Sequence, residues 1–410
     1  MRYTFQLMLT VFVFVAYFAF NTTDPKSNDT VADLNESGYI FDVNVTQINS
    51  KYSEIPSAVF RNKLVLVSSK KIGAIGNGID KNTNQPYTNL FCTDIEKGNI
   101  ELSTPILFSR ILNSKGNEGQ VSFSPNQYTI YYTRSERDNS ANYQLYKARL
   151  EYGSYGNWTN HKLIKFSSKD YSVENPHVST DGKFLYFSSN MEGGFGGFDL
   201  YRVSIETDGT LGDPINLGGT VNTDKDEKYP HTSKDGKELF FSSKGHNGQG
   251  GYDIFISNNI RDFEYSKPRN LGIKMNSIRD DIAFTLINDS KGVFSSNAGN
   301  VGQRFNMYKF NAKAIYQDLE GVILEENGEI LPNTIVVLYD SKGNEIERQL
   351  TGKDAAYIFK IRPFEEYQLK TIKAGYEDAI VEFKSNNTKI DFAFKENLKL
   401  SSKGKLAKKK

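Results

Sequence analysis

The strongest constraint on the fold is a long internal repeat. "STDGKFLYFSSNMEGGFGGFDLYRVSI" (Ser179–Ile205) returns as "SKDGKELFFSSKGHNGQGGYDIFISNN" (Ser233–Asn259), with the matching aspartates 54 residues apart. Weaker copies lie on both sides, and the third strands of five copies are registered on Leu90, Leu145, Leu200, Ile254 and Met307. Repeats of this length are units that bury their apolar faces only when they stack on neighbours.

Each copy reads as four short antiparallel strands. In the clearest copies the first turn is Asp181-Gly182 or Asp235-Gly236, a dipeptide favoured where a hairpin needs positive φ. A glycine-rich loop that ends at Asp199 or Asp253 precedes the third strand. Four-stranded sheets stacked around an axis form a β-propeller. We therefore expect an all-β chain that contains a five-bladed β-propeller.

The fifth copy lacks an obvious fourth strand, because "FNMYKFNAKAIYQDLEGV" passes directly into a different kind of sequence. The N-terminal stretch "GYIFDVNVTQINSKYSEIPSAV" resembles the joins between the other copies, with Pro56 in the place of Pro176 and Pro230. We expect Ile40–Val45 to be the outer strand of the fifth blade. Such a strand closes the ring and removes its open sheet edges.

Composition excludes several functional classes. The 410 residues carry a formal net charge of +1, which gives no reason to expect nucleic acid as a partner. Cys92 is the only cysteine, so neither an intramolecular disulfide nor a thiolate metal cluster can form. We expect Cys92 to be a buried, unreactive thiol in the third strand of the first copy.

The start of the chain has the pattern of an export signal. Arg2 precedes an apolar run from Leu7 to Phe20, which is short for a membrane span and suits a signal peptide. Phe18 and Phe20 make a poor cleavage site, so an uncleaved anchor remains open. We predict a signal peptide or N-terminal anchor over residues 1–20, a linker over 21–37, and an exported protein.

At the level of families, "SxDGKxLYFSSN…GGFDLY" resembles the WD-like (PD-type) repeat of TolB-type propellers. It is most similar to the version in exported cell-envelope proteins of bacteria that use type IX secretion. Leu319–Phe383 resembles the carboxypeptidase-regulatory-like domain that follows the propeller in those proteins, although Ala355-Ala356 replace the usual Asp-Gly. We expect no counterpart of the OmpA-type peptidoglycan-binding domain that comes next in them.

The resemblance implies three regions after the linker. We expect the five-bladed β-propeller over residues 38–313 and a small transthyretin-like β-sandwich over 314–395. A basic disordered tail is expected over 396–410, where the chain ends in "SSKGKLAKKK".

The glycine-rich stretch "GGFGGFD" (Gly193–Asp199) is open to three interpretations. A dinucleotide site needs a helix after the glycines, whereas a strand is expected here. A calcium-binding roll needs the motif every nine residues, whereas these copies are 54 apart. We favour a tight connection in which Asp199 and Asp253 accept hydrogen bonds from nearby amides or from Ser188 and Ser242.

Two histidines, His177 and His231, occupy matching positions on strands expected nearest the axis, where a pair of imidazoles can ligate a metal. Repetition alone also explains their equivalence, and the other copies have Ala58, Ser122 and Phe284 there. We predict a structural role and no metal or other cofactor.

Carboxylates in an axial funnel are the catalytic groups of propeller glycosidases. The candidates near the innermost strands are Glu54, Glu118, Glu174, Asp280 and Asp281. Their positions are roughly equivalent between copies, so a repeated capping or salt-bridging role explains them without catalysis. We predict that the protein is not an enzyme.

The functional prediction is a non-catalytic scaffold or interaction protein at the periplasmic face of the outer membrane, which binds other envelope proteins and supports type IX secretion or envelope integrity. Its variable loops are Lys70–Thr88, Arg134–Asn142 and Lys244–Gly251, and the first is an insertion. The residues expected to meet a partner are Lys70, Lys71, Asn77, Asp80 and Lys81. The alternative is a propeller lectin or glycosidase that acts on a carbohydrate in the axial funnel.

Overall fold

The computed structural model describes residues 35–73, 78–96, 100–261, 264–299, 304–385, 389 and 392–403. All regular secondary structure in these ranges is β, which confirms the all-β class. The predicted signal peptide or anchor and the partner-loop residue Asn77 lie outside the described residues. No helix in the described ranges is long and apolar enough to cross a membrane.

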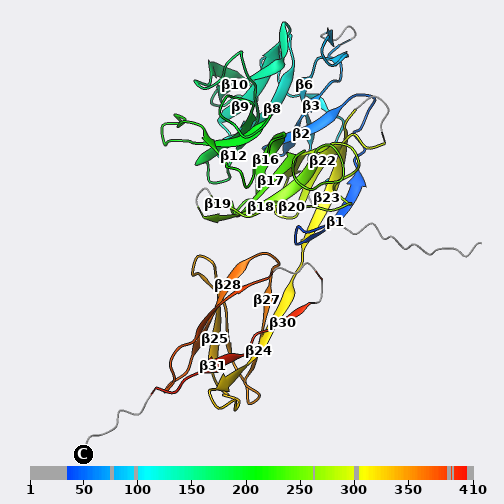
Figure 1. The fold of residues 1–410 in the computed structure, drawn as a ribbon. Coiled ribbons are helices and arrows are strands. Elements are labelled where there is room, and N and C mark those ends of the chain that lie inside the picture. Colours follow the sequence, from blue (N-terminus) through cyan, green and yellow to red (C-terminus); the bar gives the residue numbers. More distant parts are fainter. Residues whose placement is uncertain are drawn as a thin grey trace, which may run out of the picture. The chain divides into compact units, whose positions relative to one another are not determined.

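Five antiparallel sheets, here called sheets 1 to 5, follow one another along the chain from β1 to β23 (Figure 1). Sheet 1 holds β2 (Glu54–Phe60), β3 (Lys63–Ser68), β6 (Asn89–Asp94) and β7 (Ile106–Leu107). Sheet 2 holds β8 (Glu118–Phe123), β9 (Thr129–Glu136), β10 (Asn139–Leu150) and β11 (Trp158–Leu163). Sheet 3 holds β12 (Val173–Val178), β13 (Phe184–Ser189), β14 (Asp199–Ser204) and β15 (Ile215–Asn216).

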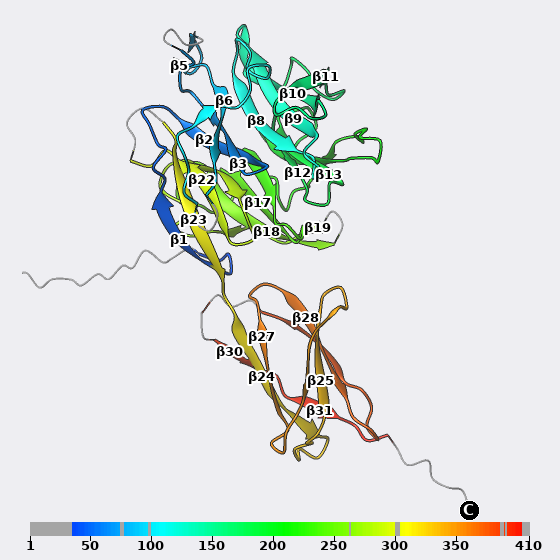
Figure 2. The same cartoon turned by 180° about the vertical axis from the view of Figure 1, so that it is seen from behind.

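The last two sheets vary this plan. Sheet 4 holds β16 (Glu227–Thr232), β17 (Glu238–Ser243) and β18 (Asp253–Arg261), whose outer edge pairs with β19 (Glu264–Tyr265) and β20 (Arg269–Asn270). Sheet 5 holds β21 (Asp281–Leu286), β22 (Lys291–Ser296), β23 (Asn306–Ala314) and the N-terminal β1 (Tyr39–Val45). In both views β1 lies along β23, and the register pairs Phe41 with Ala312 (Figures 1 and 2).

The apolar cores lie between the sheets. Val65 and Tyr132 belong to a core shared by sheets 1 and 2, and similar cores join sheets 2 and 3, 3 and 4, and 4 and 5. A fifth core joins sheet 5 to sheet 1 through Val293, Met307 and Leu66. The innermost strands also contact one another in the order β2, β8, β12, β16, β21 and again β2. Each sheet therefore covers an apolar face of the next one, as the repeat requires.

The prolines of the inner strands lie at β-bulges instead of at strand starts. The register shifts beside Pro56, and between the residues that flank Pro176 and Pro230. A bulge leaves a residue out of the ladder, so the missing proline N–H costs little there. The residue before the proline in sheets 3 and 4, Asn175 or Tyr229, has a positive φ.

A second region, from β24 onwards, consists of two further sheets that share one core. One holds β24 (Gln317–Glu325), β27 (Ala356–Ile361), β30 (Ala393–Lys395) and β31 (Leu398–Leu400). The other holds β25 (Ile335–Asp340), β26 (Glu345–Leu350), β28 (Glu366–Ile372) and β29 (Ile380–Lys384). Ala355, in the turn before β27, is buried with a φ of 56°.

One predicted boundary is wrong. The disordered tail was expected to begin at residue 396, but β31 pairs in parallel with β24 and buries Leu398 and Leu400 in the shared core. Two leucines on the same face of a short strand bury enough apolar surface to hold it there, despite the lysines around them.

Candidate functional site

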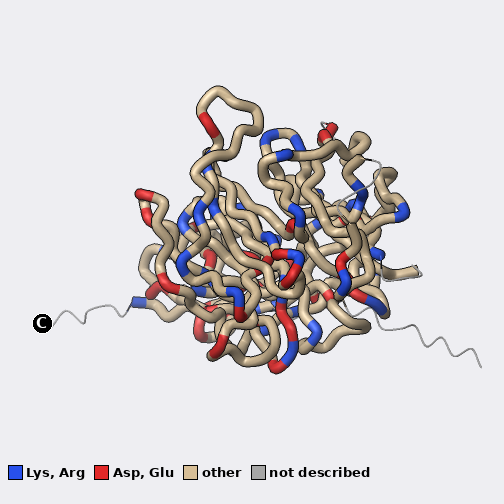
Figure 3. Tube along the Cα trace, turned by 90° about the horizontal axis from the view of Figure 1, so that it is seen from above, with Lys and Arg blue, Asp and Glu red and all other residues tan. Residues whose placement is uncertain are grey.

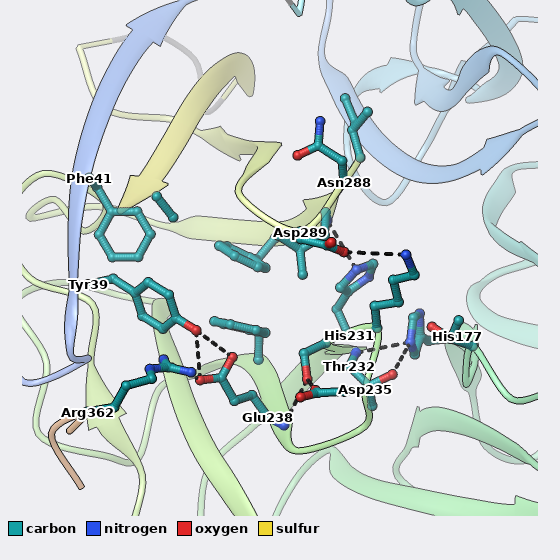
Figure 4. A pocket seen from close by; sticks show the side chains of 18 residues that line it. Tyr39, Phe41, His177, His231, Thr232, Asp235, Glu238, Asn288, Asp289 and Arg362 are labelled. Atoms are coloured by element: carbon teal, nitrogen blue, oxygen red, sulfur yellow. Dashed lines mark hydrogen bonds and ion pairs between the residues drawn. The ribbon is translucent and has the colours of Figure 1, made fainter. Parts of the chain in front are cut away.

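A pocket of about 700 Å³ opens among the turns that join the first and second strands of sheets 3, 4 and 5 (Figure 4). Its exposed rim includes Thr180, Lys234, Asp235, Asn288 and Asp289. Its inner surface is formed by His177, His231 and the buried rings of Phe41, Phe240 and Phe284. The pocket thus combines an aromatic base with a polar rim, which is the usual composition of a ligand site.

Both histidines are linked to the backbone of the next sheet. The Thr232 N–H donates to Nε2 of His177 over 3.0 Å, and the Leu286 N–H donates to Nε2 of His231 over 3.1 Å. Ser122 and Ser57 serve the preceding sheets in the same way, since each hydroxyl oxygen accepts an inner-strand N–H of the following sheet. The same kind of hydrogen bond, from a backbone amide to a side-chain acceptor, therefore joins four consecutive pairs of sheets.

The two imidazoles are neutral. Their ring centres are 4.3 Å apart, and Figure 4 shows them side by side. Burial lowers the pKa of His231 to about 4; burial and the nearby His231 hold the pKa of His177 well below 6.5. Since Nε2 accepts an amide proton in each ring, the imidazole proton belongs to Nδ1.

This tautomer argues against the metal interpretation. A histidine that binds a metal normally donates its other ring N–H to an acceptor, whereas here the other nitrogen faces a donor. The described residues contain no group of three or more His, Cys, Asp or Glu side chains placed to hold a metal ion. In sheet 5 the position equivalent to His231 is Thr285, and not Phe284 as expected from the sequence. Thr285 pairs with Val293 in the register of β21 and β22, as His231 pairs with Phe240 in that of β16 and β17.

A second polar group borders the pocket on the side of β1. The Tyr39 hydroxyl donates to the Glu238 carboxylate over 2.8 Å, and Arg362 contacts the same carboxylate at 3.1 Å. Burial and the negative charge of Glu238 raise the pKa of Tyr39 well above its ordinary value. Glu238 is 8% exposed and is fully engaged by these partners, so it has little capacity left for a ligand.

The predicted repeat residues stabilise turns. Asp181 and Asp235 each accept a hydrogen bond from the serine two residues earlier and from the amide two residues later. Gly182 and Gly236 have φ values of 73° and 69°, the left-handed backbone that the turn needs. Only Asp235 of this set lines the pocket.

The glycine-rich loops are connections between sheets. Asp199 accepts hydrogen bonds from the backbone amides of Phe195 and Gly196, and Asp253 accepts them from the amides of Gln249 and Gly250. The expected donors Ser188 and Ser242 do not bond to these aspartates. A Cβ on Gly250 would lie 2.3 Å from the Arg279 carbonyl oxygen of the next sheet. The glycines are therefore needed for close backbone approach, and the amides that would bind a phosphate are already used.

The predicted carboxylates lie at the beginning of the inner strands, which is the opposite end from the pocket. Glu54 and Asp281 each accept a hydrogen bond from the serine hydroxyl four residues earlier. Glu174 differs from these two. The carboxylate of Glu174 accepts a hydrogen bond from the Ser172 hydroxyl and forms an ion pair with Lys228 at 2.9 Å. The strand position equivalent to Glu54 and Asp281 is occupied by Val173. Glu227, which the sequence did not single out, repeats the pattern with Thr223. These groups cap loops.

Two carboxyl groups of this set titrate unusually. Burial raises the pKa of Glu118 to about 7, although the amide and side chain of Ser114 and the charge of Arg134 oppose the shift. Burial likewise raises the pKa of Asp281 to about 6, against hydrogen bonds from Ser296 and Ser277. Asp280 accepts the Tyr252 amide and the Asn297 side chain, so it also has a structural function.

The predicted partner loop contains a short hairpin of β4 (Ile79–Asp80) and β5 (Gln85–Pro86). Asp80 was expected to meet a partner, but it is 2% exposed and accepts hydrogen bonds from Asn82, Asn117 and Ser140. Burial alone would raise the pKa of Asp80, and these hydrogen bonds lower it instead. Asp80 therefore anchors the loop, whereas Lys71 and Lys81 are exposed.

Cys92 is 3% exposed in β6, and burial raises the pKa of its thiol, as the sequence predicts for an unreactive cysteine. In the view of Figure 3, lysine and arginine positions lie among aspartate and glutamate positions. This intermingling agrees with the net charge of +1 and indicates no extended surface of one sign there.

The most exposed aromatic side chains, here called the tyrosine surface, belong to the loop between β10 and β11. Tyr152 is 90% and Tyr155 91% exposed. Tyr128 stacks on Tyr152 with ring centres 6.3 Å apart, and the Arg61 guanidinium lies 5.9 Å from the Tyr155 ring. This surface was not predicted from the sequence, although "EYGSYGN" (Glu151–Asn157) has the tyrosine, serine, glycine and asparagine content of adaptable binding loops.

No family model matches this chain, and no curated protein sequence matches it. One similar solved structure is TolB from Acinetobacter baumannii, with 15% identity and a TM-score of 0.36 over 70% of this chain and 57% of that chain. Another is 3-chlorocatechol 1,2-dioxygenase from Rhodococcus opacus 1CP, with 8% identity and a TM-score of 0.18 over 21% of this chain and 59% of that chain. This chain spans little more than half of either protein, and at these TM-scores neither likeness establishes its fold or function.

Proposed function

We propose that the chain is a non-catalytic interaction protein of the bacterial cell envelope, whose tyrosine surface binds a protein partner. The observation that carries this proposal is the exposure of Tyr152 and Tyr155 beside Arg61. Tyrosine and arginine are, with tryptophan, the residues enriched at the hot spots of protein interfaces, and a glycine-rich loop lets them adapt. Two almost fully exposed tyrosines on one loop have no evident role in folding.

The scaffold that presents this surface is, we propose, a five-bladed propeller closed by β1. Three observations support the proposal: five successive sheets, a shared core between each neighbouring pair, and contact between β21 and β2. The pairing of β1 with β23 supplies the fourth strand that the last repeat lacks. The region after Gln317 would then be the carboxypeptidase-regulatory-like sandwich of the resemblance.

The cellular setting rests on the sequence. The apolar run Leu7–Phe20 after Arg2 supports export, and the repeat motif resembles that of envelope proteins associated with type IX secretion. We propose the periplasm, against the outer membrane, as the location, with support of secretion or envelope integrity as the role. Structural use of the inner-strand carboxylates supports the non-catalytic assignment.

The test is a crosslinked pull-down of the full-length chain from envelope fractions, with the mature N-terminus read by mass spectrometry. The double variant Tyr152→Ser/Tyr155→Ser should lose the captured partner. Tyr316→Ser, which changes a tyrosine that is 56% exposed outside this loop, is the matched control and should retain it. Equal capture by both variants would refute the assignment of the tyrosine surface.

A further inference from the structure

The pocket beside His177 and His231 offers a second binding activity, independent of the tyrosine surface. Each imidazole uses Nε2 as the acceptor of a backbone amide. The proton is therefore on Nδ1, and neither Nδ1 has a hydrogen-bond partner among the described residues. Both imidazoles line the pocket, so these two N–H groups are donors that a bound ligand can satisfy with acceptor oxygens.

The rim provides the complementary acceptors. One carboxylate oxygen of Asp235 accepts hydrogen bonds from the Ser233 hydroxyl and the Lys237 amide. The other carboxylate oxygen has no partner within the described part of the chain. The Asn288 side-chain oxygen already accepts the Ser290 and Lys291 amides, so its exposed side chain offers a ligand only its NH2 group. Asp289 lies 3.9 Å from Lys234, and both side chains are about three-quarters exposed, so this pair is weak and can rearrange.

This combination selects the charge of the ligand. The two cations that line the pocket, Lys234 and Arg362, lie beside Asp289 and Glu238 and do not leave an excess of positive charge. An anion would be accepted by the imidazole donors but repelled by Asp235, which has no cationic partner of its own among the described residues. A cation would suit those carboxylates but would bring only donors to the histidines. A ligand that both donates and accepts without carrying net charge satisfies the two sides together, and hydroxyl groups do so.

The two imidazoles are close enough for one small ligand to meet both of them, since their ring centres are 4.3 Å apart. A saccharide ring carries hydroxyl groups on neighbouring carbons, and each hydroxyl can both accept and donate, so a single ring can serve both sides of the pocket at once.

The base of the pocket suits the apolar face of such a ring. Phe284 is stacked between Phe240, with centres 4.2 Å apart, and Phe310, with centres 4.7 Å apart, and Phe41 lines the same pocket, so together these rings form an apolar wall. The volume of about 700 Å³ is within the range of small-ligand sites and exceeds what one monosaccharide needs.

We propose that this pocket binds an uncharged saccharide, whose oxygens accept hydrogen bonds from Nδ1 of His177 and His231 and from Nδ2 of Asn288, and whose hydroxyls donate to Asp235. The aromatic base holds the apolar face of the ring. The proposal goes beyond the binding of a protein partner, and the two activities use different residues.

The experiment is titration of the full-length purified chain with N-acetylglucosamine, its β-1,4-linked dimer, glucose and galactose, followed by ligand-observed NMR and calorimetry. An uncharged acetylated tetra-alanine amide is the peptide comparison. We expect saturable binding of at least one sugar in about the millimolar range, which is ordinary for a ligand of this size. No saturation by any of these sugars at about 50 mM, or binding of the peptide alone, overturns the proposal.

A matched pair of variants locates the site. Asp235→Ala and Asp181→Ala remove the same turn cap from equivalent hairpins, but only Asp235 lines the pocket. We expect Asp235→Ala to weaken sugar binding at least about fivefold and Asp181→Ala to leave it unchanged. Equal affinities of the two variants would overturn the placement. Loss of the partner in Tyr152→Ser/Tyr155→Ser with sugar binding intact would show that the two activities are separate.

Discussion

Replacement of His231 by glutamine tests the link between sheets 4 and 5. Glutamine Oε1 can accept the Leu286 N–H in the place of Nε2, but it does not titrate. Burial lowers the pKa of His231 from 6.5 to about 4 in the folded chain. Between these pH values the unfolded chain binds a proton at His231 that the folded chain does not, so stability falls as the pH falls.

The size of this effect follows from the shift. A difference of 2.5 between 6.5 and about 4, at 1.36 kcal/mol for each pKa unit, gives a loss of about 3 kcal/mol. The stabilisation is fully present above about pH 6.5 and is gone by about pH 4. The raised pKa values of Glu118 and Asp281 have the opposite sign, because these carboxyl groups bind protons in the folded chain.

The opposing carboxyl groups make the wild-type curve alone ambiguous. They are present in both proteins, so the difference between wild type and His231→Gln reports His231 together with its effect on the pKa of the neighbouring His177. Urea unfolding followed by the fluorescence of Trp158, the only tryptophan and 2% exposed, measures that difference. We expect wild type to lose about 3 kcal/mol relative to the variant between about pH 7.5 and about pH 4.

His231→Leu provides the complementary measurement. Leucine removes the acceptor, so the Leu286 N–H should lose its partner at a cost of about 1–2 kcal/mol near pH 7.5, whereas glutamine should cost much less. A pH-independent difference between wild type and His231→Gln would refute the assignment of a neutral, buried imidazole. Equal stability of the leucine and glutamine variants near pH 7.5 would refute the hydrogen bond.

Two further predictions concern packing. Gly250→Ala should destabilise the fold by about 1–3 kcal/mol in urea unfolding, because its Cβ would contact backbone of the next sheet at 2.3 Å, whereas Gly156→Ala, with no atom within 4 Å, should be neutral or slightly stabilising. Truncation after Lys395 removes β31 and should destabilise the C-terminal sheets by about 3–6 kcal/mol in calorimetry, since two buried leucines are lost. Truncation after Lys403 is the control, and equal melting of the two truncated chains would contradict this role of β31.

The repeat predicts what the copies share. The period of 54 residues led directly to the four-stranded unit, to the turns at Asp181 and Asp235, and to the pairing partner of Ile40–Val45. These features follow from local backbone requirements and from apolar alternation, both of which are written in each copy. The error at β31 has the same origin, because a composition rich in lysine outweighed two leucines whose burial depends on a strand about 75 residues earlier in the chain.

The pocket follows from differences between copies, which a period does not describe. Its rim takes Lys234 and Asp235 from one turn and Asn288 and Asp289 from the next, and these two turns differ in sequence. Tyr39 arrives from the N-terminal strand, far from the others in sequence. Asp80 is a different kind of error. It is a polar residue in an insertion and was therefore predicted to lie on the surface, but it is buried and accepts three hydrogen bonds.

The histidines show how a structural position acquires a second use. Ser57 and Ser122 accept an inner-strand amide with the single polar atom of their side chains. His177 and His231 occupy the same link with Nε2, but an imidazole has a second nitrogen, and its N–H remains available to the pocket. The two histidines therefore occupy equivalent positions because each accepts a backbone amide of the next sheet. Histidine, unlike serine, also keeps an N–H that can donate to a ligand. Exchange of His177 for glutamine should preserve the link between sheets, because Oε1 reaches about as far as Nε2, while it weakens sugar binding, and sugar binding unchanged by that exchange would separate the two uses.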